Sequence, residues 1–510
     1  MIPTTAHLRG LLRPKFDLAR YRSEWLGNVP KDLLAGITVA LALIPESIGF
    51  SIIAGVEPQV ALYASFTIAA VAAFLGGRPG MVSAATGAMA LVMVPLVASH
   101  GLEYLLAATV LTGVLQVVFR LLRLSRYIRY VPRPVMSGFV NALALLLFLS
   151  QLDLLAVGEP VMWALVVGGL AIIHLFPRLT RAIPAPLVAV VLLTGIIVAL
   201  ELPTMTVGNR GALPASLPSF HVPMVPFTLE TLQIIFPYAF ALAMVGLTES
   251  LLTASIVDEL TDTPSNKHTE AWGQGVANIV TGFFGGMAGC AMVGQSAINV
   301  RSGGRGRLST FTAGAFLLFL VVSLGDWVAR IPTGALVAVM ITVAIDTFDW
   351  KSVRQLRVLP VSESLVMLVT VATVVATHDL SKGVLVGVLL SALLFARSVS
   401  KGVTVDVSLS AEGRRVYTVR GNLFFVSVES FLSAFESVVH ADEVELDFTH
   451  AQVWDTSAVS AIERVRLKLE AQGSRVSLSG LDAASLAMVE RFSRAAPQET
   501  ASGPSVADGH

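Results

Sequence analysis

An almost unbroken series of apolar segments between Asp32 and Arg397 constrains this chain more than any other feature. One helical crossing of a bilayer needs about 20 predominantly apolar residues. Only 14% of the 510 residues are charged, whereas a soluble protein averages about 25%. The chain is therefore predicted to be an integral membrane protein surrounded by a lipid bilayer. Runs separated by glycine, proline or charge indicate fourteen segments, with centres near Leu41, Ile68, Ala90, Leu111, Ala144, Val167, Val191, Ala241, Ile279, Ala297, Leu317, Val339, Met367 and Val388.

Lysine and arginine are distributed unevenly between the loops that join these segments. Loops after even-numbered segments carry fifteen of them, and loops after odd-numbered segments carry only Arg210, Arg330 and Lys382. Basic loops stay in the cytoplasm, so the even-numbered loops are predicted to be cytoplasmic. An even number of segments places both termini on that side, and we expect a multi-pass protein of the cell inner membrane.

The composition changes after Arg397, which predicts a second domain. We expect a cytosolic N-terminal segment over 1-31, without a removable signal peptide, and a transmembrane domain over 32-397. Strands and helices alternate between 398 and 495, which indicates a cytosolic α/β domain with a central sheet. Residues 496-510 have the composition of a disordered tail. The formal net charge of zero gives no sign of a nucleic-acid partner, and we expect none.

Two pairs of similar sequences indicate an internal repeat. ALALIPESIGF resembles ALAMVGLTESLL, and the match places Glu46 opposite Glu249. GGRPGMVSAATGAMALV, which begins at Gly76, resembles GGMAGCAMVGQSAINV, which begins at Gly285. The two offsets, 203 and 209 residues, agree closely. This agreement predicts that the membrane domain consists of two related halves.

Repeat one is predicted over about 32-202 and repeat two over about 230-397, with about seven segments in each. Because seven is odd, the two repeats must cross the membrane in opposite directions. Inverted repeats with interrupted helices in corresponding positions are typical of secondary transporters, whose binding site lies near the bilayer midplane. The repeat therefore predicts a transporter.

The glycine-rich run from Gly285 to Gly304 is apolar, but it is too short and too rich in glycine for an ordinary crossing helix. About ten residues, from Cys290 to Val300, are predicted to be helical before Arg301 ends the helix. Backbone that is not helical survives at membrane depth only where protein or a water-filled cavity satisfies it. A half-helix that starts there points unpaired N–H groups and a positive dipole end inward, which favours anions. The alternative is a simple glycine-rich loop between two helices.

The matching stretches of the two repeats are predicted to form one small pocket. If the N-termini of the two half-helices face each other, their backbone N–H groups suit an oxyanion or a carboxylate. Small residues would let the ligand approach closely, and a few polar side chains could add hydrogen bonds. Tight helix packing through small residues is the alternative. The predicted substrate-binding residues are Thr86, Gly87, Ala88, Met292, Val293, Gly294, Gln295, Ser296 and Glu46.

Glu249 is the most informative charge, because it lies deep inside an apolar segment. An ionisable residue at that depth is costly and marks a functional site by default. A carboxyl group taken out of water favours its protonated form, so Glu249 could carry a proton. With Thr253 one turn away on the same face, it could instead help to hold sodium. A purely structural glutamate is the third alternative. Glu46, its counterpart in repeat one, is expected to line the same cavity.

The single cysteine, Cys290, excludes an intramolecular disulfide, and its small apolar neighbours predict a buried packing residue. The sequence contains no phosphate-binding loop, no metal-spaced His/Cys cluster and no GxSxG. We therefore expect no catalytic residue, no metal site and no cofactor other than a coupling ion. The chain is not expected to be an enzyme.

With these residues assembled, the chain resembles the sulfate permease (SulP) family, the solute-carrier anion transporters that carry a C-terminal STAS domain. The resemblance covers nearly the whole chain and rests on NVRSGGRGRLS, ESLLTASIVDEL, GQGVANIVTGFFGG and VELDFTHAQVWDTSAV. It implies a polytopic α-helical membrane protein with fourteen segments in a 7+7 inverted repeat, core and gate subdomains, and half-helices at segments 3 and 10. It also implies an elevator-like movement, a homodimer, and a cytosolic α/β STAS domain that regulates transport or binds a cytosolic protein partner.

Departures from the family pattern bear on the mechanism. Gln295 stands where animal members commonly carry an arginine, and without that cation the charge of the substrate could be balanced by a co-transported proton or sodium. Glu249 stands where sodium-coupled bicarbonate relatives have an aspartate, which leads us to prefer H+ over Na+ as the coupling ion. DTSA replaces DSSG in the STAS loop, where Asp455 and Thr456 have N-cap chemistry. Asp455, Thr456 and Ser457 are therefore candidate regulatory residues, with phosphorylation at either hydroxyl left open.

The function expected from these observations is proton-coupled symport of a small oxyanion or carboxylate, such as sulfate, bicarbonate or a C4-dicarboxylate. Glu249 and Thr253 are the candidate coupling-ion residues. Sodium-coupled bicarbonate symport, uncoupled anion exchange and a channel are the alternatives within transport. From a different class, the chain could be a membrane sensor that signals through its STAS domain.

Overall fold

The computed structural model describes residues 18–122, 132–156, 160–180, 183–358, 360–377, 380–400, 403–410, 414–435 and 441–495. These residues form two compact units, one that ends at Val388 and one that begins at Leu389. The tail predicted to be disordered, and most of the predicted N-terminal segment, lie outside the described residues.

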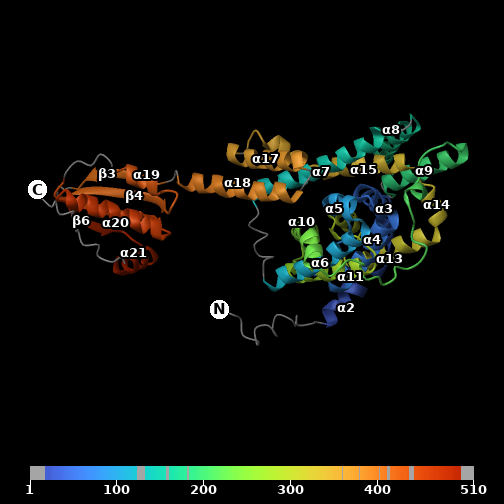
Figure 1. Ribbon diagram of the computed structural model, residues 1–510, viewed down its shortest axis with the longest axis horizontal. Coiled ribbons are helices and arrows are strands. Elements are labelled where there is room, and N and C mark those ends of the chain that lie inside the picture. The colour runs from blue at the N-terminus through green and yellow to red at the C-terminus, as the bar shows by residue number, and fades with distance from the viewer. Residues whose placement is uncertain are drawn as a thin grey trace, which may run out of the picture. The chain divides into compact units, whose positions relative to one another are not determined.

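The first unit consists almost entirely of helices, and each of the fourteen predicted segment centres lies inside one of them. Among the described residues, six helices are long and apolar enough to cross a bilayer, and five more apolar helices have 10 to 17 residues. The helices fall into two packed sets, one with α3, α4 and α11 and one with α7, α15 and α17 (Figure 1).

The core set is built from segments near the beginning of each predicted repeat. Helix α11 packs against α4 and α6, α13 packs against α3 and α4, and α10 packs against α6. Its helices are α3 (Val29–Ala54), α4 (Pro58–Leu75), α5 (Gly87–His100), α6 (Leu102–Leu121), α10 (Leu229–Thr261), α11 (Lys267–Phe283), α12 (Val293–Arg301) and α13 (Arg307–Ser323).

The gate set is built from the later segments of each repeat. Helix α7 packs against α15 and α17, and α8 packs against α9 and α15. Its helices are α7 (Arg133–Ala156), α8 (Pro160–Leu175), α9 (Ala185–Leu200), α15 (Thr333–Thr347), α16 (Trp350–Gln355), α17 (Val361–Thr377) and α18 (Leu380–Ser400), the last of which continues into the second unit. The remaining short helices are α2 (Leu18–Leu26), η3 (Phe176–Arg178), η4 (Val207–Arg210) and α14 (Gly325–Ala329).

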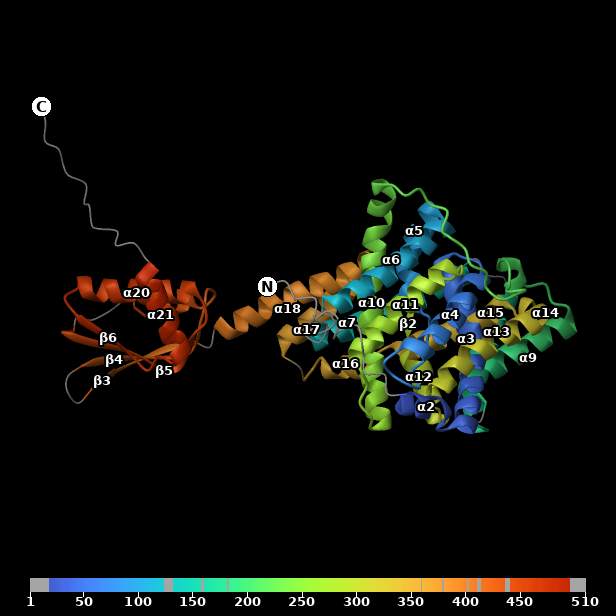
Figure 2. The ribbon, with the colours of Figure 1, turned by 90° about the horizontal axis from the view of Figure 1, so that it is seen from below.

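A two-stranded ribbon crosses the interior of the core set. Strand β1 (Ser83–Ala85) runs antiparallel to β2 (Gly289–Ala291), with Ala84 opposite Cys290. Each strand leads directly into a short helix, α5 of 14 residues or α12 of 9. At a rise of 1.5 Å per residue these helices are about 21 Å and 14 Å long, so neither crosses a hydrocarbon layer of about 30 Å alone. Figure 2 shows α5 on one side of β2 and α12 on the other.

The second unit contains a four-stranded mixed sheet in the order β3-β4-β5-β6. Strands β3 and β4 are antiparallel, whereas β4 pairs with β5, and β5 with β6, in parallel. Buried aromatic and aliphatic side chains from the sheet and α20 form a core of their own. The elements are β3 (Thr404–Leu409), β4 (Arg415–Leu423), α19 (Val428–Ser433), β5 (Glu443–Val453), α20 (Thr456–Ala471), β6 (Arg475–Ser479) and α21 (Ala483–Ala495).

Candidate functional site

The two half-helices start from opposite ends of the β1–β2 ribbon. Because the strands are antiparallel and each helix continues its strand, the N-termini of α5 and α12 are directed toward each other. Three residues of strand span about 10 Å, which sets the approximate separation of the two helix starts along the ribbon. The positive dipole ends of both helices converge on this place.

Neither half-helix has a side chain that caps its N-terminus. Thr86 and Met292 occupy the N-cap positions, and neither accepts a hydrogen bond from its own helix through its side chain. The first internal bonds run from the N–H of Ala90 to the carbonyl of Thr86, and from the N–H of Ser296 to the carbonyl of Met292. The N–H groups ahead of them have no partner within the helix, and they are the groups that an anion would bind.

The surroundings of the two N-termini differ. A methyl group at Gly87 would lie 2.8 Å from Cδ2 of Leu147 and 3.0 Å from Cε1 of Phe50, so the start of α5 is closed by packing. At the start of α12, the Val293 side chain is 40% exposed and a methyl group at Gly294 would meet nothing within 4 Å. The site is therefore accessible from the α12 end.

Several of the predicted polar side chains are already engaged within the protein. The hydroxyl of Ser296 accepts from the N–H of Val82 at 3.0 Å, which fixes the residue before β1. The hydroxyl of Thr86 lies 3.3 Å from Sγ of Cys290. In contrast, Oε1 of Gln295 is buried and has no hydrogen-bond partner. An amide oxygen only accepts hydrogen bonds, so this atom of Gln295 can receive an O–H or N–H from a ligand, whereas its amide N–H group faces Glu46.

Carboxyl groups flank the site on two sides. Glu46, in the middle of α3, is 8% exposed and faces the amide of Gln295. Asp346 of α15, which the sequence analysis did not single out, lies close enough for its charge to act on Glu46. Within the described residues, no arginine or lysine pairs with Glu46 or Glu249. Any negative ligand here must therefore be balanced by something other than a fixed cation.

Glu249 is half-buried in the middle of α10. Its Oε2 accepts a hydrogen bond from the thiol of Cys290 at 2.7 Å. The hydroxyl of Thr253, one turn further along and fully buried, donates to the carbonyl of Ala291 at 3.5 Å. Both predicted coupling residues thus contact β2, the strand that leads into α12. Cys290 is buried, as predicted, but its hydrogen bonds give it more than a packing role.

A buried polar stripe on α11, absent from the sequence-based list, holds the ribbon in place. The amide of Asn278 donates to the carbonyl of Gly289 at 3.1 Å and accepts from its N–H at 2.9 Å. The amide of Gln274 donates to the hydroxyl of Ser83 at 2.6 Å and to Oε1 of Glu270 at 2.8 Å. These side chains recur every four residues along α11, a spacing that places them on one face and could have revealed them.

The composition of the site does not resemble a metal centre. In the part of the chain that the structure describes, no three or more His, Cys, Asp or Glu side chains are grouped so that they could hold a metal ion.

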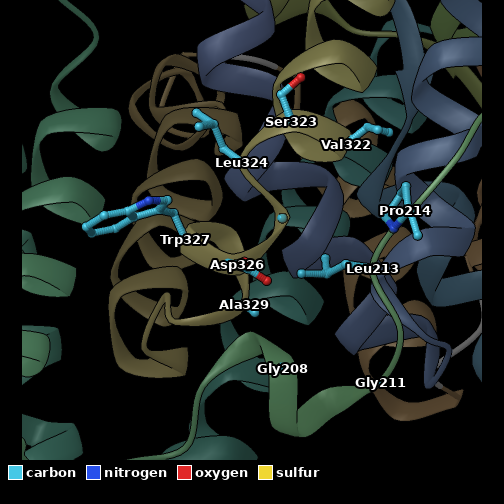
Figure 3. Close-up of a pocket in the computed structure, with 12 residues that line it drawn as sticks. Gly208, Gly211, Leu213, Pro214, Val322, Ser323, Leu324, Asp326, Trp327 and Ala329 are labelled. Atoms are coloured by element: carbon cyan, nitrogen blue, oxygen red, sulfur yellow. The ribbon is translucent and has the colours of Figure 1, made fainter.

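A separate cavity of about 550 Å³ lies between the connection from α9 to α10 and the end of α13 (Figure 3). Gly208, Leu213 and Pro214 form one wall, and Ser323 and Asp326 belong to the other. None of the predicted site residues lines this cavity. Among the described residues that line the cavity, Asp326 is the one ionisable side chain, so these residues offer no positive charge to attract an anion.

In the second unit, the loop before α20 is built as an N-cap. Oδ1 of Asp455 accepts from the N–H of Ala458 at 2.9 Å, and Oδ2 accepts from the N–H of Phe425 at 2.8 Å. Thr456 and Ser457 are exposed in the first turn of α20. A phosphate there would be stabilised by the helix N-terminus, but phosphorylation stays a prediction.

Comparisons with known proteins agree with this architecture. Residues 29–159 and 155–370 match the Sulfate permease family, and residues 407–494 match the STAS domain. YbaR of Bacillus subtilis (strain 168), assigned as a sulfate transporter, is 54% identical over 92% of this chain and 98% of its own. The bicarbonate transporter BicA of Picosynechococcus is 29% identical over 71% of this chain and 69% of its own.

Solved structures show the same fold. The transmembrane domain of a cyanobacterial BicA gives a TM-score of 0.62 at 28% identity and covers 72% of this chain and 97% of that domain. Murine Slc26a9 in the inward-facing state gives a TM-score of 0.82 at 17% identity, over 96% of this chain and 91% of its own, which shows the fold alone. The predicted polytopic helical membrane protein with a C-terminal STAS domain is confirmed, and so is the family resemblance.

Proposed function

Because the chain belongs to the sulfate permease family, a family of anion transporters and not of enzymes, we propose that it catalyses proton-coupled symport of a small oxyanion. The observation that carries the proposal is the pair of uncapped half-helix N-termini, which converge on one place in the core. Such a site recognises negative charge and small size.

Charge balance supports coupling to a cation. The two carboxyl groups near the site, Glu46 and Glu249, are not paired with a basic side chain among the described residues. Unit charges 4 Å apart repel each other by about 4 kcal/mol at an effective dielectric constant of 20. A cation that enters with the anion would remove this penalty, and it would leave with the anion on the other side.

The contacts of Glu249 favour a proton over sodium. A hard cation is best held by a shell of several oxygen atoms. Here one carboxylate oxygen already accepts from the thiol of Cys290, and the hydroxyl of Thr253 is turned to a backbone carbonyl. A carboxyl group with these neighbours can take up a proton without a surrounding shell of oxygen ligands.

Sulfate is the first candidate substrate, and bicarbonate and C4-dicarboxylates follow. The identity of 54% to YbaR supports sulfate, and the more distant likeness to BicA supports bicarbonate. The mostly backbone-lined site itself distinguishes anions by charge and size only.

An elevator-like movement of the core set against the gate set would carry the site across the membrane. The contact between the sets supports this, because small residues face apolar side chains there: Gly49 of α3 packs on Met340 of α15, and Gly87 packs on Leu147 of α7. Such a contact contains few directional bonds that would resist sliding. We further propose an inner-membrane homodimer with both termini in the cytoplasm and a STAS domain that binds a cytosolic protein.

The test is uptake of radiolabelled sulfate, bicarbonate, fumarate, nitrate and chloride into proteoliposomes, with and without pH and sodium gradients. We expect sulfate uptake that is stimulated when the side from which sulfate enters is acidic. Stimulation by sodium alone would indicate sodium-coupled symport, and flux that ignores both gradients would indicate exchange or a channel. Ligand binding without flux would indicate a sensor.

A further inference from the structure

We propose that the thiol of Cys290 connects the protonation state of Glu249 to the anion site through the hydroxyl of Thr86. The inference rests on the proposed function, because it explains how a proton on α10 could control an anion at the start of α5. Cys290 is a positioning residue in this scheme, since it touches neither the anion nor bulk water.

The three groups form a continuous chain of hydrogen bonds from Glu249 through Cys290 to Thr86, which we call the relay. Sγ of Cys290 lies 2.7 Å from Oε2 of Glu249 and 3.3 Å from Oγ1 of Thr86. A thiol has one proton to donate. While that proton is donated to the Glu249 carboxylate, the Thr86 hydroxyl must donate its own proton to the sulfur. In this state the Thr86 hydroxyl has no proton left for a ligand.

Protonation of Glu249 allows the chain to reverse. The new carboxyl O–H donates to the sulfur of Cys290, and the S–H turns and donates to Oγ1 of Thr86. Thr86 then accepts, and its own O–H is free to donate to an anion at the start of α5. One proton is added at Glu249, every other group keeps its own proton, and the anion site gains one hydrogen-bond donor.

The position of Thr86 makes this exchange effective. Thr86 is the N-cap residue of α5, where a threonine hydroxyl usually accepts from the helix itself. That bond is missing, because the side chain is turned to Cys290 instead. The Thr86 hydroxyl lies beside the uncapped N–H groups of α5. When it no longer donates to the sulfur, it becomes one more hydrogen-bond donor for an anion held by those N–H groups.

A second observation points to the same place. The side chain of Gln116 is fully buried, and its Nε2 has no hydrogen-bond partner. A methyl group at Gly246 would lie 2.9 Å from this Nε2 and 3.6 Å from Cβ of Cys290. Buried donors are rarely left unpaired. Gln116 and Cys290 thus both border Gly246, so an unpaired buried donor lies in the neighbourhood of a cysteine whose hydrogen bonds are proposed to change during the transport cycle.

The first experiment measures the affinity of reconstituted protein for sulfate as a function of pH, for the wild type, Cys290→Ser and Cys290→Ala. We expect the wild-type affinity to fall about tenfold or more as pH rises, since one hydrogen bond to a charged group is worth about 1.5–3 kcal/mol. Cys290→Ala should bind at every pH about as tightly as the wild type does at low pH, because no sulfur is left to accept from the Thr86 hydroxyl. Cys290→Ser, which keeps both a donor and an acceptor, should retain the pH dependence. Thr109→Val is the matched control, because the buried Thr109 hydroxyl donates to a carbonyl of its own helix, that of Leu105.

A double-mutant cycle tests whether Cys290 acts through Thr86. Thr86→Val alone should also abolish the pH dependence but bind weakly at every pH, because it removes the donor itself. Cys290→Ala combined with Thr86→Val should bind like Thr86→Val. Losses that multiply would overturn the relay, because they would show two independent contributions. A pH dependence retained in Cys290→Ala would overturn it as well.

Infrared spectroscopy separates this inference from the proposed function. The chain has one cysteine, so one S–H stretching band reports on one bond. Glu249→Gln should move that band to higher frequency, because a neutral amide accepts more weakly than a carboxylate, and Cys290→Ser should remove it. An unmoved band would overturn the relay whatever the transport result. A moved band in a protein whose uptake ignores pH gradients would overturn the proton coupling and leave the thiol contact standing.

Discussion

The two half-helices stand in corresponding positions of the two repeats, yet they begin in different environments. At the start of α5, Leu147 and Phe50 close over Gly87. At the start of α12, Val293 and Gly294 face open space. The repeat therefore supplies two similar anion-attracting ends, and the gate helices cover only one of them. We infer that the ligand enters at the start of α12, while the hydrogen bonding of Thr86 at the start of α5 depends on the protonation state of Glu249.

The acidic residues differ in the same way. Glu46 and Glu249 match in the repeat alignment, but Glu46 faces Gln295 in the other repeat while Glu249 bonds to Cys290 in its own. Residues that occupy matching positions in the two repeats can therefore have different hydrogen-bond partners and different roles. The following predictions test this asymmetry, beginning with the largest expected effect.

Replacing the two glutamates separately should give very different losses. Glu249→Gln should lower gradient-driven sulfate uptake by a factor of about 100 or more, because the amide cannot carry the coupled proton. Glu46→Gln should change it by less than about tenfold, since that side chain contacts the open half-helix and not the relay. Initial rates with and without an imposed pH gradient measure both effects. Equal losses in the two variants would remove the distinction between the carboxyl groups.

Adding a charge at the open end should weaken substrate binding. Gln295→Glu keeps the shape of the side chain and places a second carboxylate next to Glu46. We expect the KM for sulfate to rise about tenfold at neutral pH through charge repulsion. The increase should shrink at low pH, when the new carboxyl group is protonated. A KM that does not move would place the anion away from Gln295.

The two glycines at the helix starts should respond in opposite ways. Gly87→Ala forces a methyl group against Leu147 and should cost about 1–3 kcal/mol, with uptake reduced about fivefold. Gly294→Ala meets open space and should fold normally, with a KM within about twofold of the wild type. Leu147→Ala in the Gly87→Ala background should restore uptake. Thermal unfolding in detergent together with sulfate kinetics measures both, and similar losses at the two glycines would contradict the asymmetry.

The smallest expected effects concern the side chains that hold the ribbon. Asn278→Ala removes two hydrogen bonds from Gly289 of β2 and should cost about 1–3 kcal/mol of stability. Ser65→Ala removes a longer bond, at 3.3 Å, to the N–H of Ala85 in β1, together with a bond of 2.7 Å to the hydroxyl of Ser47. Ser47→Ala removes the second bond alone, so the additional loss in Ser65→Ala, about 0.5–1 kcal/mol, belongs to β1. The midpoint temperatures of thermal unfolding of the purified variants show how much each strand's hydrogen bonds contribute to stability. If the additional loss in Ser65→Ala over Ser47→Ala exceeded the loss in Asn278→Ala, β1 would be the strand whose hydrogen bond matters more for stability.

The sequence alone predicted a large part of the site. The glycine-rich runs predicted two interrupted helices, because too few apolar residues separate their ends to cross a bilayer. The position of Glu249 within an apolar segment predicted that its carboxyl group contacts polar groups inside the protein and does not face lipid. Both expectations follow from local chemistry, since a bilayer imposes length and polarity on each segment by itself.

The partners of these residues could not be predicted in the same way. Cys290, Asn278 and Gln274 carry no local sign of function, and their roles follow from which helices meet at the ribbon. Asp346 lies three positions from Asp349, near the end of a segment, and it joins Glu46 only because α15 packs against α3. Contacts between residues that belong to different helices and strands depend on how whole helices pack.

The amino-acid sequence by itself determined that this chain crosses a membrane many times, that its two halves correspond, and that each half contains one broken helix. These properties follow from hydrophobicity, glycine content and repeated motifs, which act over a few turns of chain. Only the tertiary structure decided that β1 and β2 pair antiparallel, that one helix start is closed and the other open, and that a thiol joins Glu249 to Thr86. The physical reason is that hydrogen bonds and steric closure act over a few ångströms, and only the packed helices bring these groups that close.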